Sequence, residues 1–305
     1  MIKVGCCYHP KLAGEPAGRF AEELRAIAAQ HVSETWIADA WDEEATRRHV
    51  PGTDLLVCVG GDGTVLRAAR AVVTHETLLL GVNMGHLGFL SELDADAAVS
   101  RLPEVIAGAG YVEERAMLHA QILKTAGGDG GETAARHDAL NDVVIGRVTL
   151  GRTVHMTVAV DGSLLADFHA DGIIVATATG STAYSLSVGG PILPPESGEM
   201  LLTPLAPHLA PRNSVVLPPS AVIEVKLAPG QQATLSVDGE RDLDLGKGGE
   251  TVRVALGPNR ARFLRLGPPA EFYTRLAGRL NWLRQYGDDA PGSPDSALPG
   301  EEARR

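Results

Sequence analysis

The segment 60–64, with the sequence GGDGT, combines a glycine-rich turn with a single carboxylate and directly follows the apolar run Leu55–Val59. Five apolar residues before a glycine predict a buried parallel strand that ends in a tight turn, and the pattern over 65–73 predicts a helix after it. Such a unit directs free backbone N–H groups at an anion such as phosphate. Because a carboxylate repels phosphate, Asp62 fits better as a general base or a magnesium ligand, although Asp-Gly pairs are also typical of ordinary turns.

A second group of hydrogen-bonding residues, ATATGSTAYS at 176–185, follows the apolar stretch 173–175. Small hydroxyls and free N–H groups can bind ribose hydroxyls and an adenine edge, and the ring of Tyr184 offers a stacking face. Taken alone, the segment fits a Ser/Thr-rich loop with a core tyrosine at least as well. It therefore indicates nucleotide binding only together with the turn at Asp62.

The composition excludes several classes of protein. The chain has 305 residues, 44% of them hydrophobic, which is enough for a large core and one or two domains. A net charge of −11 argues against a general nucleic-acid binder or a protein of anionic membrane surfaces. No apolar run reaches the roughly 18 residues of a membrane span, and Met1–Val4 begins a strand rather than a signal peptide. Cys6, Cys7 and Cys58 have neither disulfide nor zinc spacing, as expected for buried thiols in the cytoplasm.

Up to about residue 110, strand-like and helix-like segments alternate, which predicts an α/β domain with an open parallel sheet. The predicted strands are 2–8, 55–59 and 77–82, and the predicted helices are 20–30, 65–73 and 95–107, the last interrupted at Pro103. Ligands of such sheets bind beyond the carboxyl ends of the strands. Asp62 and the turn at 83–89 both fall at such ends.

After residue 111 the pattern changes to alternating apolar residues with turn signals at 127–130, 161–162 and 238–239. These signals predict hairpins, so 111–268 is expected to be an all-β, antiparallel and sandwich-like domain. A helix is expected within 269–286, packing back on the α/β domain. The polar, Gly- and Pro-rich stretch 287–305 is expected to be a disordered tail.

Taken together, the motifs closely resemble those of the NAD kinase family. They are GGDGT at 60–64, GHLGFL at 85–90, the Asn141-Asp142 pair, DGIIVATATGSTAYSLSVGGPI from 171, LTPLAPH at 202–208 and SVDG at 236–239. The resemblance covers nearly all of the chain before the tail. It implies an enzyme that phosphorylates the 2′-hydroxyl of the adenosine ribose of NAD to give NADP, with ATP or polyphosphate as donor, and a homodimer or homotetramer.

The resemblance also implies a role for individual residues. Asp62 matches the catalytic aspartate of the family. The implied binding residues are Gly63, Phe89, Asn141, Asp142, Asp171, Thr179, Thr182, Ala183, Tyr184 and His208. No residues are assigned as a dedicated metal site. Because neither motif contains an arginine fork, Mg²⁺ or another divalent cation on the phosphates is expected to neutralise the transferred group, and Asp62 could be base, metal ligand or both.

Three positions depart from the usual family pattern. Asp142 stands where the family has glutamate, Ala178 where it has proline, and Glu240 where it has glutamine. The shorter side chain of Asp142 reduces the reach of one expected ribose contact. None of the three changes affects Asp62.

Two other functions remain open from the residues alone. A lipid or diacylglycerol kinase shares the GGDGT turn but does not account for the cluster at 179–184. A non-catalytic NAD(P)-binding sensor would keep the nucleotide site, but it would not need the carboxylate of Asp62.

Overall fold

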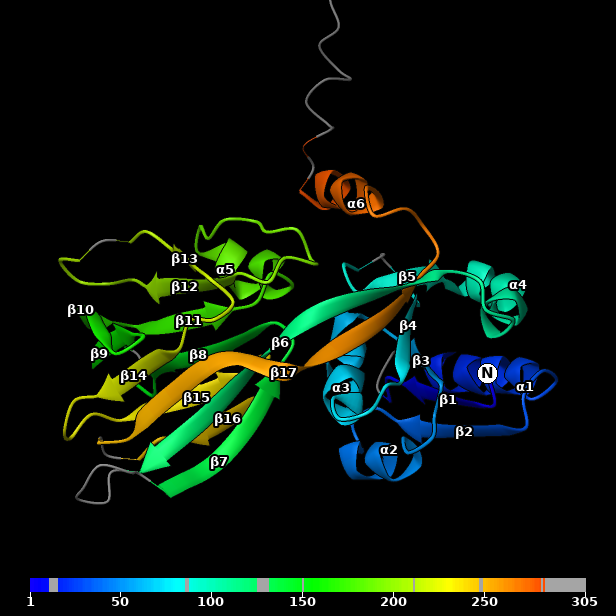
Figure 1. The fold of residues 1–305 in the computed structure, drawn as a ribbon, viewed down its shortest axis with the longest axis horizontal. Helices are drawn as coiled ribbons and strands as arrows, with labels where there is room; N and C mark the ends of the chain where they lie inside the picture. Colours follow the sequence, from blue (N-terminus) through cyan, green and yellow to red (C-terminus); the bar gives the residue numbers. More distant parts are fainter. Residues whose placement is uncertain are drawn as a thin grey trace, which may run out of the picture. The chain divides into compact units, whose positions relative to one another are not determined.

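The computed structural model describes residues 1–10, 16–85, 88–124, 132–149, 151–210, 212–246, 249–280 and 282. One compact unit runs from Met1 to Leu266, and a second begins at Gly267. Within the first unit, a lobe of parallel strands and helices is followed by a β-rich lobe (Figure 1). We call residues 1–110 the N-terminal lobe and residues 111–266 the β lobe.

The N-terminal lobe alternates strands and helices. Its elements are β1 (Lys3–Tyr8), α1 (Pro16–Ala28), β2 (Glu34–Asp39), α2 (Glu43–His49), β3 (Leu55–Val59), α3 (Asp62–Val72), β4 (Leu78–Asn83), β5 (Ser91–Asp94) and α4 (Ala95–Ile106). Strands β2, β1, β3 and β4 lie in that order and run parallel, and β5 adds to β4 in the same direction. The predicted α/β class is confirmed.

Both faces of the central strand β3 are covered by helices. Leu55, Val57 and Val59 pack in one cluster with residues of α1 and α4, whereas Leu56 and Cys58 pack in another with residues of α3. Alternate residues of a strand point to opposite faces. The unbroken apolar run therefore reflects burial on both sides, as in other parallel sheets.

The expected helices differ from the structure in several places. Helix α1 spans Pro16–Ala28 rather than 20–30. Helix α4 continues through Pro103 instead of being interrupted there, and its Leu102 and Val105 are buried. Packing of this apolar face therefore outweighs the hydrogen bond lost at proline. Helix α3 begins at Asp62 rather than at residue 65, so the carboxylate is part of the first helical turn.

The β lobe consists of two facing antiparallel sheets. Its elements are β6 (Tyr111–Lys124), β7 (Glu132–Ala139), β8 (Asp142–Arg147), β9 (Val154–Val160), β10 (Ser163–Ala170), β11 (Gly172–Ala176), the 3-10 helix η1 (Gly180–Thr182), α5 (Tyr184–Ser187), β12 (Met200–Leu205), β13 (Val215–Leu217), β14 (Ile223–Leu227), β15 (Ala233–Val237), β16 (Arg241–Asp244) and β17 (Thr251–Arg265). One sheet has the order β13-β12-β11-β8-β15-β16. In the other, β10, β9, β14, β17, β6 and β7 pair antiparallel. Apolar side chains of both sheets form one buried cluster, which confirms the sandwich-like second domain.

Strand β17 belongs to both lobes. It pairs antiparallel with β6 along most of its length, and near its end Arg262 and Phe263 pair parallel with Leu78 and Leu79 of β4. The fully buried Phe263 packs in the same cluster as residues of α3. The boundary expected after residue 110 thus falls inside one compact unit with a shared sheet.

The second unit contains α6 (Glu271–Arg279), a helix within the expected range 269–286. Its packing on the α/β domain stays a prediction. The predicted tail at 287–305 and the turn signal at 127–130 lie outside the described residues. Among the described residues, no helix combines the length and apolarity that crossing a membrane requires.

Candidate active site

Asp62 lies at the start of α3, where the positive end of the helix dipole favours a negative charge. The N–H of Phe89 donates to Asp62 Oδ2 at 3.0 Å, and the N–H of Leu90 donates to Oδ1 at 3.1 Å. A Cβ atom at Gly88 would lie 1.8 Å from Oδ1, so only glycine permits this close approach. The structure therefore brings Asp62 and Phe89 together at the carboxyl ends of β3 and β4.

The glycines of the GGDGT turn leave its tip open. A Cβ atom at Gly60 would lie 2.3 Å from Thr64 Oγ1, whereas one at Gly61 or Gly63 would have nothing within 4 Å. Gly63 also lies in the first turn of α3, where backbone N–H groups have no acceptor inside the helix. An anion could approach this N–H without displacing a side chain.

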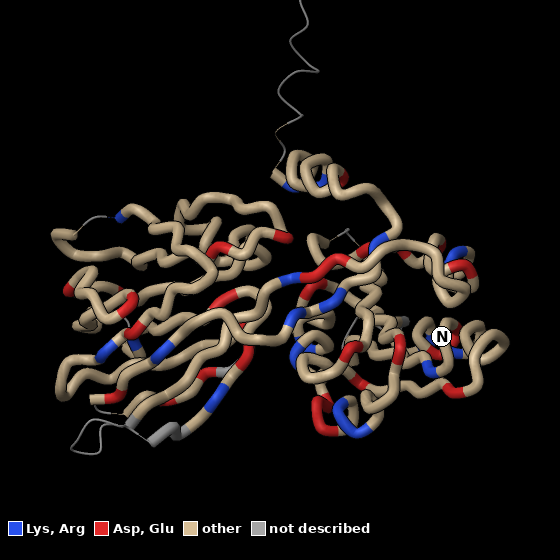
Figure 2. Tube along the Cα trace, in the orientation of Figure 1, with Lys and Arg blue, Asp and Glu red and all other residues tan. Residues whose placement is uncertain are grey.

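A buried ion network supports the segment that Asp62 contacts. Arg265 pairs with Glu113 at 3.0 Å and with Glu92 at 3.2 Å, and it donates to the carbonyl of Leu90 at 3.4 Å. Charged positions gather where β6 and β17 run between the lobes (Figure 2). These pairs fix the start of β5, and with it the N–H groups of Phe89 and Leu90 that donate to Asp62.

Arg115 is a buried cation in the same network that the sequence analysis missed. It pairs with Glu113 at 2.7 Å. Burial and the neighbouring charge of Arg265 lower the pKa of Arg115 to about 10, whereas Glu113 and the more distant Asp62 oppose the shift. The side chain therefore stays charged at neutral pH, and the negative charge of Asp62 stabilises this charged form. The sequence contains one indication of it: the arginine lies next to acidic residues near the start of β6.

The Asn141-Asp142 pair lies at the start of β8 and lines a cavity of about 320 Å³. Ala183 and Tyr184 line the same cavity, so the structure joins the two expected binding segments. Tyr184 is 45% exposed, which leaves its ring available as a stacking face. Asp238, from the SVDG motif, also lines this cavity.

Most hydroxyls of the segment 176–185 hold the loop itself. Thr177 Oγ1 donates to the carbonyl of Leu140 at 2.5 Å, and Thr182 Oγ1 donates to the carbonyl of Thr179 at 3.1 Å. The hydroxyl of Thr179 is buried and has no hydrogen-bond partner among the described residues. Direct ribose contacts from Thr179 and Thr182 therefore stay predictions, and this geometry favours a structural role for Thr177.

Asp238 fixes the backbone of the Asn141-Asp142 pair. Its carboxylate accepts the N–H groups of Leu140 at 3.1 Å, Asn141 at 2.8 Å and Asp142 at 3.2 Å. Burial raises the pKa of Asp238, while the guanidinium of Arg70 and the three backbone donors act in the opposite direction. Sequence analysis identified this aspartate as a hairpin residue of the SVDG motif but did not predict these contacts, because its partners are distant in the chain.

Burial and the neighbouring charge of Asp238 raise the pKa of Asp142 to about 7. Its side chain is almost fully buried at the cavity wall. A carboxyl group with this pKa is near its midpoint of ionisation at neutral pH. It can then either accept or donate a hydrogen bond to a hydroxyl in the cavity.

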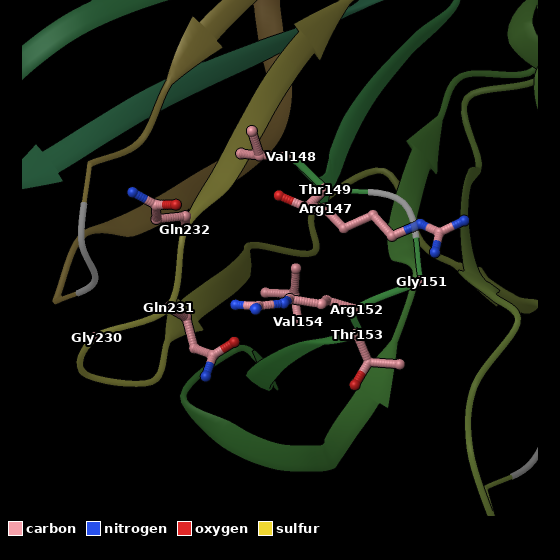
Figure 3. Close-up of a pocket in the computed structure, with 10 residues that line it drawn as sticks. All are labelled: Arg147, Val148, Thr149, Gly151, Arg152, Thr153, Val154, Gly230, Gln231 and Gln232. Carbon is pink, nitrogen blue, oxygen red and sulfur yellow. The ribbon is translucent and has the colours of Figure 1, made fainter.

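Asp171 lies away from this cavity. It precedes β11, and the far end of that strand, Ala176, is the residue that pairs with Asp142. The carboxylate of Asp171 pairs with Arg147 at 3.1 Å. Arg147 lines a separate polar cavity of about 680 Å³ at the turns between β8 and β9 and between β14 and β15 (Figure 3).

His208 is exposed and follows β12. Its backbone N–H donates to the carbonyl of His169 at the end of β10, at 2.7 Å. This contact places it near the start of β11, on the side of Asp171 rather than of Asp142. Within one chain, His208 and Asp171 are therefore not part of the cavity at Asn141.

Both lobes match models of one protein family. Residues 5–111 match the ATP-NAD kinase N-terminal domain, and residues 140–266 match the ATP-NAD kinase C-terminal domain. The NAD kinase of Chloroflexus aurantiacus is 44% identical over 231 residues, which cover 76% of this chain and 82% of that protein. The chain belongs to the ATP-NAD kinase family. The expected resemblance is confirmed, and the match of both lobes decides against the lipid-kinase alternative.

Two solved structures share the fold of this ATP-NAD kinase family member. Yeast NADH kinase complexed with NADH aligns with a TM-score of 0.78 and 23% identity, covering 92% of this chain and 88% of that chain. An NAD kinase from Archaeoglobus fulgidus in complex with ATP aligns with a TM-score of 0.68 and 23% identity, covering 92% and 99%. The arrangement of an α/β lobe and a β lobe is thus common to these proteins.

The raised pKa of Asp142 predicts a pH-dependent stability. An acid with a higher pKa in the folded than in the unfolded chain binds its proton more tightly when folded. Wild-type protein should therefore lose stability relative to Asp142→Asn as the pH rises from 3.8 to about 7. The slope is at most about 1.4 kcal/mol per pH unit, measured by urea unfolding across this range. The exposed Asp96→Asn should follow wild type, and parallel curves for wild type and Asp142→Asn would contradict the raised pKa.

Proposed function

We propose that the chain transfers a phosphoryl group to the 2′-hydroxyl of the adenosine ribose of NAD, giving NADP, with Asp62 as general base. Family membership supports the reaction class. The observation that carries the residue assignment is the placement of Asp62 at the start of α3, in a glycine turn with an open tip. The cavity at Asn141 and Asp142 supplies a binding site for the acceptor.

In this proposal, the Asp62 carboxylate accepts the proton of the 2′-hydroxyl as that oxygen attacks the terminal phosphorus of the donor. A new oxygen–phosphorus bond forms, and the bond to the leaving phosphate chain breaks. The N–H bonds from Phe89 and Leu90 use one acceptor position on each oxygen of Asp62. These two bonds fix the orientation of the carboxylate that would accept the proton.

ATP is the proposed donor, which the ATP complex of the Archaeoglobus fulgidus kinase supports; polyphosphate is the alternative. No group of three or more His, Cys, Asp or Glu among the described residues could hold a metal. Mg²⁺ usually binds one or two carboxylates plus substrate phosphates, so Asp62 alone fits an ion carried by the donor. When bound, the ion would neutralise charge on the transferred group.

The cavity at β8 is the proposed acceptor site. The ring of Tyr184 would stack on a base, the Asn141 amide would bind its polar edge, and Asp142 would bind a ribose diol. Asp171 and His208 lie away from this cavity in the same chain, so a role for them in NAD binding requires a second subunit. We therefore propose a homodimer or homotetramer with shared sites.

A cytoplasmic location is proposed as well. The thiols of Cys6, Cys7 and Cys58 are free and buried. Cys7 and Cys58 are direct neighbours on paired strands, yet they form no disulfide. Adjacent reduced thiols are typical of a reducing compartment.

A matrix of donors and acceptors tests the proposed function. ATP and polyphosphate are each combined with NAD and NADH, with and without Mg²⁺, and formation of NADP or NADPH is followed. We expect turnover of NAD with ATP that depends on Mg²⁺. Binding of NAD without any product in all combinations would identify a non-catalytic sensor instead.

Asp62→Asn should lower kcat by roughly a hundred- to ten-thousand-fold, because the amide cannot accept the proton. NAD affinity should change little. Asp54→Asn is a matched control, since Asp54 also accepts two backbone N–H groups, those of Ile2 and Lys3, but lies outside the site. If Asp62→Asn keeps more than about a tenth of wild-type turnover, Asp62 is not the base.

Asp142→Ala should weaken NAD binding roughly ten- to a hundred-fold, because a charge-assisted hydrogen bond contributes about 1.5–3 kcal/mol. The KM for the donor should stay unchanged. Asp142→Glu, which restores the reach of the usual family residue, should recover most of the affinity. Calorimetric titration of NAD and melting curves of the free proteins distinguish this result from a purely structural role, in which stability falls and affinity is kept.

A further inference from the structure

Arg70 connects the helix of the proposed base to the β lobe. It lies on α3, the helix that begins at Asp62, and its side chain is only 7% exposed. Its Nη1 donates to Asp238 Oδ2 at 3.2 Å, and its Nη2 pairs with Glu240. The planar guanidinium thus holds two carboxylates of the β15–β16 hairpin at once.

The same Asp238 carboxylate holds the acceptor site. It accepts the N–H groups of Leu140, Asn141 and Asp142, and the N–H of Asp238 donates to the carbonyl of Asp142 at 2.9 Å. An unbroken series of direct contacts therefore runs from α3 through Arg70 and Asp238 to the backbone of the Asn141-Asp142 pair. In this series Arg70, Asp238 and Asp142 are buried, and Asn141 is partly buried.

Apolar packing brings the same two segments together. Leu140, directly before the pair, is fully buried in one cluster with Val65 and Leu66 of α3. Such packing fixes how closely the segments approach, but it has little directional preference. The hydrogen bonds of Arg70 and Asp238 add direction, because they weaken steeply with distance and angle.

We propose that Arg70 is a positioning residue of the kinase: through Asp238 it sets the Asn141-Asp142 pair, and the ribose bound there, relative to Asp62. This inference rests on the proposed function. Transfer requires the 2′-oxygen within about 3–3.5 Å of its reaction partner, so a small displacement of the acceptor site lowers the rate strongly. Arg70 itself touches neither substrate nor reacting atoms in this scheme.

Arg67 provides a matched control on the same helix. It pairs with Glu240 at 2.9 Å and lies over the ring of Trp41 at 4.3 Å. These contacts reach the hairpin at Glu240 rather than at Asp238. Loss of Arg67 removes an ion pair between the same two elements without breaking the connection to the Asn141-Asp142 pair.

The test compares kcat, both KM values, the calorimetric Kd for NAD and melting curves for wild type, Arg70→Met and Arg67→Met. Arg70→Met should lower kcat/KM for NAD roughly ten- to a hundred-fold and weaken NAD binding, with the donor KM unchanged. Arg67→Met should stay within about threefold of wild type, as expected for a partly exposed ion pair. Equal losses in the two variants, or a lower melting temperature with unchanged kinetics and Kd, would overturn the proposal.

Two further variants keep the test decisive. Arg70→Lys retains the charge but not the planar fork, so it should show the same pattern with a smaller loss if Arg70→Met does not fold. The second is Arg70→Met combined with Asp238→Asn, measured beside Asp238→Asn alone. It removes both buried charges of the pair, and should lose less than the sum of the two single variants. If the losses of the two single variants add in the double variant, Arg70 and Asp238 act independently, which contradicts the proposal.

Failure of this inference is distinct from failure of the proposed function. If wild type forms no NADP, the proposed function is wrong, and the Kd for NAD still decides the role of Arg70. If wild type forms NADP and Arg70→Met behaves like Arg67→Met, only the positioning role is wrong.

Discussion

The carboxylate of Asp238 is the interaction on which the geometry of the site depends. Three consecutive backbone N–H groups and one guanidinium converge on its two oxygens. A buried carboxylate without such partners would be strongly destabilising, whereas with them it rigidifies the surrounding backbone. The residue that would bind substrate, Asp142, is next to this charge, so the group that positions it adds to the effect of burial in raising its pKa.

Apolar packing and buried ion pairs both hold the elements of the two lobes together. Three large clusters of buried apolar side chains hold the helices to the parallel sheet and the two antiparallel sheets to each other. Where the lobes meet, buried ion pairs add to the apolar packing, at Arg70 with Asp238 and at Arg265 with Glu92. Removing one partner of such a pair costs more than the pair contributes, which favours a single arrangement of the two lobes.

The sequence predicted what is local in the chain. The strand, turn and helix around Asp62 follow from contiguous residues, and the change of period along the chain predicts both a parallel and an antiparallel region. The interruption at Pro103 was wrong because a buried helix face overrides a local propensity. Arg70 could not be connected with Asp238, since 168 positions separate them and no local pattern encodes that contact.

The structure explains the glutamate at position 240, which the sequence alone does not. In the sequence it is a departure from the usual glutamine, with no evident effect. In the fold, its carboxylate pairs with both Arg67 and Arg70. A glutamine could accept hydrogen bonds there but carries no charge. With glutamate, the two carboxylates of Asp238 and Glu240 balance the two guanidinium groups of Arg67 and Arg70.

The path of β17 has a consequence for how the chain is made. Leu78 and Leu79 of β4 are paired by Arg262 and Phe263, which leave the ribosome long after β4. At about 5–20 residues per second, this interval is on the order of ten seconds or more. During that time the edge of the nascent parallel sheet is open at Leu78 and Leu79, and the buried ion pairs of Arg265 lack their cation. The N-terminal lobe therefore completes its sheet only after Arg262 and Phe263 have been translated.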